Sequence, residues 1–212
     1  TSDVNISKEM LNEVIHEVVD DTFNMVSVDG DTSTNDMLSV MANGLANNKE
    51  IVQKDESYHI FKDALMYICE LLSKGIAKDG EGATKLLTCH VNNACSQKDA
   101  KVVAKSVITS SLFKAAMFGK DANWGRILCA IGYCEASYDV DKIEVTLASS
   151  AGSILVCQNG RGYPFDEDQA LKILSEDEIE ILIDLHDGNY QATAWGCDLT
   201  YDYVKINGDY RT

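Results

Sequence analysis

The sequence has little proline, few basic residues and no long apolar run. Its 212 residues include one Pro, 18 Lys plus Arg and 34 Asp plus Glu, which gives a formal net charge of −16. The single Pro excludes proline-rich linkers, and the charge excludes a basic face for nucleic-acid phosphates or for anionic lipid. No apolar run approaches the ~20 residues of a membrane span, so we expect neither nucleic acid nor membrane as a partner.

The cysteines are odd in number and scattered in spacing, a pattern typical of reduced thiols rather than of disulfides. A chain of this length buries most of such thiols as small apolar groups, and no signal peptide is visible, so we expect a cytoplasmic location. The chain starts at Thr1 and not at Met, which fits either a trimmed chain or a fragment released from a precursor. The seven cysteines are Cys69, Cys89, Cys95, Cys129, Cys134, Cys157 and Cys197.

Apolar residues recur at helical spacing in the first part of the chain. This spacing predicts helices over residues 7–25, 37–46 and 56–75, a long helix from Ser96 to Gly119, and a short helix beyond residue 126. Ser7 is a candidate N-cap, and Ser96 with Asp99 resembles a capping box.

The second part of the chain has the pattern of short strands. A strand is expected from Leu86, and further strands over residues 142–148, 152–158, 179–185 and 190–197. The pair Asp187-Gly188 predicts a hairpin turn between the last two strands, and a helix is expected from Asp198. The change of pattern across residues 95–140 indicates two subdomains without a flexible linker.

The loop over residues 29–36 carries many side-chain oxygens. Asp29, Asp31 and Ser33 start like a calcium loop, but Thr34 stands where such a loop has Gly, and Val40 stands where it has Glu. The loop therefore either caps the helix expected after it or lines a site.

Two further patterns leave alternatives open. Glu81 lies between Gly80 and Gly82, where it is either a solvated turn residue or a carboxylate presented to a cationic ligand. The surrounding GEGATK segment is no phosphate loop, because it leaves a helix and enters a strand. Thr1 could act as an N-terminal nucleophile with its own amine as the base.

Five stretches taken in order resemble one known family, the β chain of ornithine acetyltransferase (glutamate N-acetyltransferase) of arginine biosynthesis. The resemblance covers essentially the whole chain; each motif is weak alone, but their order and the matching C-terminus make it specific. The stretches are residues 28–36 (VDGDTSTND), 80–85 (GEGATK), 121–127 (DANWGRI), 159–162 (NGRG) and 194–212 (AWGCDLTYDYVKINGDYRT).

The resemblance implies that the catalytic threonine lies outside this sequence. Precursors of that family cleave themselves at an Ala-Thr bond within a pattern similar to Ala-Thr-Met-Leu-x-Phe-Ile-Thr-Thr-Asp, and the new terminal Thr becomes the nucleophile. Thr1, Ser2 and Asp3 match the last three positions. The nucleophile is therefore expected about six residues upstream of Thr1, with Thr1 itself as the fallback.

The resemblance also implies substrate contacts at Glu81, Asn207 and Thr212. The substrates would be N-acetylornithine and glutamate, and the acetyl group would pass through an acetyl-threonine. The partner would be an α chain from the same precursor, which supplies the oxyanion hole in an α2β2 heterotetramer. No metal or organic cofactor is expected, and acetyl-CoA stays open as a second acetyl donor.

The fold implied is an α/β (α+β) arrangement, a layered αββα sandwich of the aminopeptidase-esterase type with a smaller C-terminal α/β subdomain. We expect a nucleophile-side subdomain over residues 1–97, a second subdomain over 98–197, and a tail over 198–212 that returns to the active site. Two rival functions remain: an aminopeptidase or amidase of the same fold, and a non-catalytic acidic subunit that binds a partner.

Overall fold

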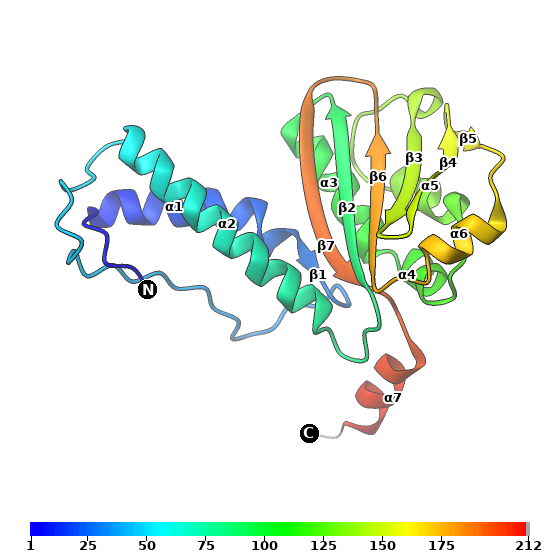
Figure 1. Cartoon of the computed structure of the whole chain (residues 1–212), viewed down its shortest axis with the longest axis horizontal. Helices are drawn as coiled ribbons and strands as arrows, with labels where there is room; N and C mark the ends of the chain where they lie inside the picture. The colour runs from blue at the N-terminus through cyan, green and yellow to red at the C-terminus, as the bar shows by residue number, and fades with distance from the viewer. Residues whose placement is uncertain (211–212) are drawn as a thin grey trace. The chain divides into compact units, whose positions relative to one another are not determined.

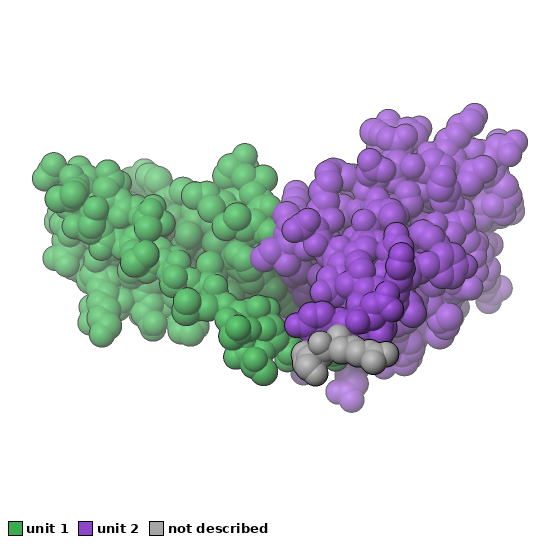
Figure 2. Space-filling model, turned by 90° about the horizontal axis from the view of Figure 1, so that it is seen from below, with its two compact units in different colours: residues 1–24, 31–73 green, residues 25–30, 74–212 purple. Residues whose placement is uncertain are grey.

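The computed structural model describes residues 1–210, which form an α/β fold with one mixed, seven-stranded sheet (Figure 1). The chain forms two compact units, residues 1–24 with 31–73, and residues 25–30 with 74–212 (Figure 2). These bounds differ from the subdomains predicted over residues 1–97 and 98–197, because strands from both of those segments share one sheet. No helix in the described part of the chain is long and apolar enough to cross a membrane.

The first unit contains α1 (Lys8–Asp21) and most of α2 (Glu56–Lys78). Ser7 is the N-cap of α1, as predicted, and its hydroxyl accepts a hydrogen bond from the Met10 amide. Val14 and Val18 of α1 are fully buried in one cluster with Tyr58 and Cys69 of α2. The cluster stabilises the unit through apolar burial.

The helix predicted over residues 37–46 is wrong. This segment forms no helix, and its backbone pairs with the N-terminal segment: the Ser2 amide donates to the Met41 carbonyl, and the Asn43 amide donates to the Ser2 carbonyl. Met37 and Met41 are exposed, so their helical spacing buries no apolar face. Interstrand backbone bonds thus override a weak helical pattern.

An ion-pair network joins α1 to α2 within the first unit. The carboxylate of Glu17 lies 2.7 Å from the Lys54 ammonium and 2.6 Å from the Lys62 ammonium. The hydrogen bond from Lys54, followed by that from Lys62, lowers the pKa of Glu17 from 4.5 to about 2.

We expect Glu17→Gln to lower the unfolding free energy by about 0.5–1 kcal/mol at neutral pH. A lowered folded-state pKa stabilises the protein above the unfolded value and loses that effect as protons bind. The difference between wild type and variant should therefore shrink as the pH falls from 4.5 toward about 2. Thermal melts over this range measure it, with Glu50→Gln as the control; a pH-independent difference would contradict the assignment.

The second unit is built on the sheet, whose strand order is β1-β7-β2-β6-β3-β4-β5. Its strands are β1 (Val26–Ser27), β2 (Leu86–Ala94), β3 (Glu144–Ser149), β4 (Gly152–Gln158), β5 (Arg161–Gly162), β6 (Glu178–Asp184) and β7 (Tyr190–Cys197). The strands predicted in the second half of the chain thus form close to their expected places. Short 3-10 turns cover Phe23–Met25 and Val140–Lys142.

The helices of this unit are α3 (Gln97–Thr109), α4 (Ser111–Phe118), α5 (Trp124–Gly132), α6 (Glu167–Ile173) and α7 (Tyr201–Asp209). Ser96 is the N-cap of α3, as the capping-box pattern predicts. The single long helix predicted up to Gly119 is wrong, because Ser110 is extended and its hydroxyl accepts from the Phe113 amide. The serine therefore ends one helix and caps the next.

The predicted hairpin between β6 and β7 is also wrong. β2 lies between them, parallel to β6 and antiparallel to β7. The connection crosses the end of β2, and a Cβ at Gly188 would collide with the Ala94 carbonyl group. The Asp-Gly pair thus marks a close backbone approach instead of a two-residue turn.

The sheet has one face that is covered by helices and another that carries charged groups. Ile179, Ile181 and Ile183 of β6 are fully buried in the core with residues of α3, α4 and α5, while Glu178 and Glu180 are exposed on the opposite face. The described residues supply one sheet and one helix layer of the expected αββα sandwich.

Candidate functional site

The structure brings Glu81 and Asn207 together at one end of the sheet. Asn207 Nδ2 donates to Glu81 Oε2 at 2.7 Å, although 126 residues separate the two in the chain. Glu81 lies in the turn that enters β2, and Asn207 lies on α7, which follows β7 (Figure 1). β2 begins where β7 ends, with Leu86 opposite Cys197, so the antiparallel register places both segments at the same end.

The third predicted contact, Thr212, lies outside the described residues. Glu81 and Asn207 are both exposed, so a ligand could reach the carboxylate and the amide. A carboxylate with an adjacent amide is suited to an ammonium group and to neighbouring polar atoms.

The turn around Glu81 packs directly against the first turn of α7. Thr200, the N-cap of α7, accepts a hydrogen bond from the Tyr203 amide, and its own hydroxyl donates to the Gly82 carbonyl at 2.7 Å. Gly82 has a φ of +66°, and a Cβ there would lie 2.6 Å from the Tyr203 nitrogen. Only glycine fits this approach, so the Gly-Glu-Gly pattern reflects packing as well as turn geometry.

Asp198 was missed as a site residue, because sequence analysis placed it only at a helix start. The side chain is buried, and Oδ1 accepts the Thr84 and Lys85 amides at 2.8 and 2.9 Å. Oδ2 accepts the Thr84 hydroxyl at 2.5 Å. Thr84 lies 114 residues earlier, so no local pattern signals the contact.

The segment at Val28 and Asp29 also contacts α7. The hydroxyl of Tyr203 donates to Asp29 Oδ2 at 2.9 Å, and the buried Lys114 ammonium donates to the Val28 carbonyl. Burial lowers the pKa of Lys114, with partial compensation from Cys197 and Asp29.

Asp29 therefore belongs to the same polar region as Asn207, since Tyr203 and Asn207 are four residues apart on one helix. The interpretation of residues 29–36 as a helix cap is wrong, because the helix expected directly after them does not form and the next helix is α2, from Glu56. The contact of Asp29 with α7 instead favours the alternative, a site-lining role, for the start of this loop.

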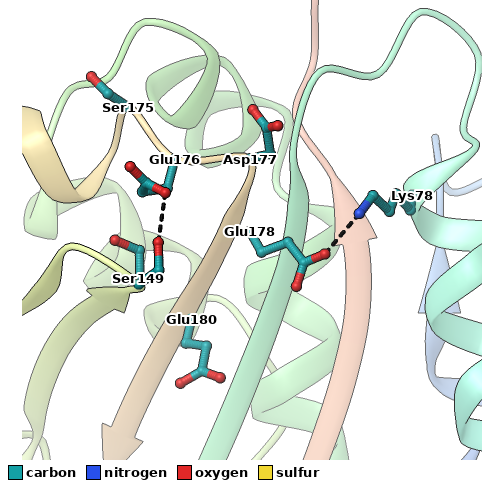
Figure 3. Close-up of a pocket in the computed structure, with 8 residues that line it drawn as sticks. Lys78, Ser149, Ser175, Glu176, Asp177, Glu178 and Glu180 are labelled. Atoms are coloured by element: carbon teal, nitrogen blue, oxygen red, sulfur yellow. Dashed lines mark hydrogen bonds and ion pairs between the residues drawn. The ribbon is translucent and has the colours of Figure 1, made fainter.

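A separate hollow lies on the charged face of the sheet (Figure 3). Its carboxylates are already engaged in part: Lys78 pairs with Glu178 at 2.7 Å, and the Ser150 hydroxyl bonds Glu176. Neither Glu81 nor Asn207 lines it. We therefore place the candidate site at the turn and α7, and not in this hollow. The hollow is lined by Lys78, Ser149, Ser150, Ser175, Glu176, Asp177, Glu178 and Glu180.

The fold and the site define a mixed α/β protein with a polar site where a Gly-Glu-Gly turn meets a C-terminal helix. The sequence matches the ArgJ family over residues 1–212, and the chain belongs to this family. This family assignment confirms the resemblance found from the motifs.

Similar proteins agree with this assignment. The arginine biosynthesis bifunctional protein ArgJ 1 of Clostridium acetobutylicum is 53% identical over 211 residues, which are 100% of this chain and 52% of that protein. The ArgJ of Caldanaerobacter subterraneus is 50% identical with the same coverage. The chain thus spans about half the length of the curated relatives it matches.

A solved structure confirms the fold. The crystal structure of the arginine biosynthesis bifunctional protein argJ from Bacillus halodurans superposes with a TM-score of 0.93 at 43% identity. The match covers 99% of this chain and 97% of that chain.

Proposed function

We propose that this chain is the β subunit of a cytoplasmic acetyltransferase of arginine biosynthesis, which moves the acetyl group from N2-acetylornithine to glutamate. Membership of the ArgJ family and the names of its relatives support the pathway. The single observation that carries the site is the contact between Glu81 and Asn207, two residues that the motifs single out separately.

The reaction proceeds by acyl transfer in two halves. The hydroxyl of the upstream threonine attacks the acetyl carbonyl of N-acetylornithine, the C–N bond breaks, and ornithine leaves with the proton on its amine. The amine of glutamate then attacks the threonine ester, which forms N-acetylglutamate and returns the free hydroxyl. Each tetrahedral intermediate needs hydrogen-bond donors for its oxyanion, and we assign these to the α chain.

Glu81 and Asn207 bind and orient substrate in this scheme. The Glu81 carboxylate accepts charge-assisted hydrogen bonds from a substrate ammonium. The Asn207 amide holds this carboxylate in place through its bond to Oε2 and offers its oxygen to polar substrate atoms. Thr212 is proposed as a third contact. The scheme needs no metal or organic cofactor, and acetyl-CoA would enter only as an alternative acetyl donor.

The proposed partner is the α chain of the same precursor, in an α2β2 assembly. The curated relatives are about twice as long as this chain, whereas the matched chain of the Bacillus halodurans structure has nearly its length, as a cut precursor would give. In the first unit, α2 exposes several large apolar side chains that do not belong to the cluster shared with α1. Such exposed side chains are typical of a surface that a partner covers, and we assign this surface to the α chain. It comprises Ile60, Tyr67, Ile68, Leu71 and Leu72.

The function is tested by incubating the whole protein with N-acetylornithine, with and without glutamate. Formation of N-acetylglutamate, and an acetylated threonine in the mass spectrum when glutamate is omitted, is the expected result. Release of free acetate at a rate independent of glutamate would instead indicate an amidase or aminopeptidase. A protein that neither transfers acetyl nor becomes acetylated would be a non-catalytic subunit.

Glu81→Gln is expected to reduce kcat/KM for N-acetylornithine by about 10- to 100-fold, because the neutral amide loses charge-assisted bonding to the ammonium. Stability should hardly change, since Glu81 is exposed. Steady-state kinetics measure the effect, with the exposed Glu167→Gln on α6 as the matched control. Unaltered kinetics in Glu81→Gln would return this residue to the role of a solvated turn residue.

A further inference from the structure

We propose that Asp198 is a positioning residue, whose buried carboxylate fixes the spacing between Glu81 and Asn207. The inference rests on the proposed function, in which these two residues bind substrate. Asp198 itself is buried, and its carboxylate is bonded to Thr84 and Lys85, so it would act through the two segments that it joins.

Both oxygens of the carboxylate are used in joining these segments. Oδ1 accepts hydrogen bonds from the backbone amides of Thr84 and Lys85, and Oδ2 accepts one from the Thr84 hydroxyl. Three hydrogen bonds to one carboxylate fix its position and its plane, since an acceptor bonded at both oxygens can neither slide nor rotate freely. The entry to β2 is thereby held against the residue that follows β7.

The connections from this anchor to the site are short and bonded. Glu81 is three residues from Thr84, within a turn closed by the Ala83 amide bond to the Gly80 carbonyl at 2.9 Å. On the other side, Asn207 follows Asp198 by nine residues, through the Thr200 cap and α7. A displacement of Asp198 would therefore also displace Glu81 and Asn207, because the connecting segments are short and hydrogen-bonded.

A purely structural role does not require a carboxylate at this place. Burying a charge has a desolvation cost, and a well-packed apolar pair of similar volume is often equally stable. Among residues 1–210, the hydrogen bonds to the Asp198 carboxylate come from two backbone amides and a hydroxyl. Such hydrogen bonds fix the orientation of the two segments that carry Glu81 and Asn207. This orientation matters where a ligand is recognised through charge-assisted hydrogen bonds.

The test uses substitutions of Thr84 in the whole protein. They change the hydrogen bond from the Thr84 hydroxyl to Asp198 and nearly preserve the shape of the side chain. Thr84→Val removes the hydroxyl that Oδ2 accepts, and Asp198→Asn changes the acceptor itself. We expect each to raise KM for N-acetylornithine about 10-fold while kcat changes by less than about 2-fold, the scale of one lost bond to a charged group. Thr84→Ser, which keeps the hydroxyl, should recover most of the loss. Thermal melts show which variants are folded.

A double-mutant cycle with Glu81→Gln separates positioning from general stability. If Thr84 acts through Glu81, then Glu81→Gln should reduce kcat/KM by less than about 3-fold in the Thr84→Val background. This reduction is well below the one that the same substitution causes in the wild-type protein. Full additivity, or an unchanged KM in folded Thr84→Val, would overturn the positioning role while leaving the proposed function intact. A wild-type protein without acetyl transfer would overturn both.

Discussion

Replacement by Ala of the threonine about six residues upstream of Thr1 should abolish both precursor cleavage and acetyl transfer, with a loss of about 10⁴-fold or more. The reason is chemical: this hydroxyl is the proposed acceptor of the acetyl group, and without it no ester forms. Thr1→Val should retain both activities. Thr1 is exposed and precedes the segment in which Ser2 pairs with the strand-like stretch near Met41, a structural setting that needs no hydroxyl.

N-terminal sequencing of the active mature chain and mass spectrometry after exposure to N-acetylornithine measure this prediction. The acetyl group should be found on a terminal Thr that is followed by Met-Leu. A mature chain that begins at Thr1, with Thr1 acetylated, would contradict the alignment and make Thr1 the nucleophile.

Gly82→Ala should reduce kcat/KM for N-acetylornithine by at least about 100-fold. The backbone at Gly82 has a φ of +66°, and the new Cβ would lie 2.6 Å from the Tyr203 nitrogen and 2.8 Å from the Asp202 carbonyl carbon. Since backbone atoms cannot rotate away as a side chain does, α7 must move, and Asn207 moves with it. Steady-state kinetics of the complete protein measure the loss.

Gly208→Ala is the matched control for this substitution. Gly208 lies near the end of the same helix and does not adopt a positive φ, and in the described part of the chain no neighbouring heavy atom lies within 4 Å of the added Cβ. Alanine should leave activity unchanged and favour α7 by about 0.5–1 kcal/mol, because it loses less backbone entropy than glycine. Equal kinetics for the two alanine variants would show that the position of α7 does not matter for catalysis.

Sequence analysis succeeded where the cause of a structure is local. Ser7 and Ser96 cap helices through contacts three residues away, and the strands of the second half follow from their own alternation. Sequence analysis failed where the structure of a segment depends on pairing with a segment distant in the sequence. Residues 37–46 pair with Ser2 and Asp3, and the strand after Asp187-Gly188 pairs with β2 and not with β6.

The site shows the same division. Glu81 was singled out from its two flanking glycines, but its connection to Asn207 came from the family resemblance and not from spacing. Asp198 could not be found, because its partners Thr84 and Lys85 lie more than a hundred residues earlier. A single sequence carries no signal that relates such positions.

The place of β2 in the sheet has a consequence for how the chain folds. Its two neighbours in the sheet, β6 and β7, are the last of these strands to be synthesised, since β6 begins at Glu178 and β7 ends at Cys197. Contacts of such long separation close slowly, because the entropy of a large loop is lost before any pairing is gained. Of the elements made before β6 and β7, α3 packs against β2 and can support it during synthesis. The centre of the sheet, and with it the junction of Glu81 and Asn207, forms only after β6, β7 and α7 have left the ribosome.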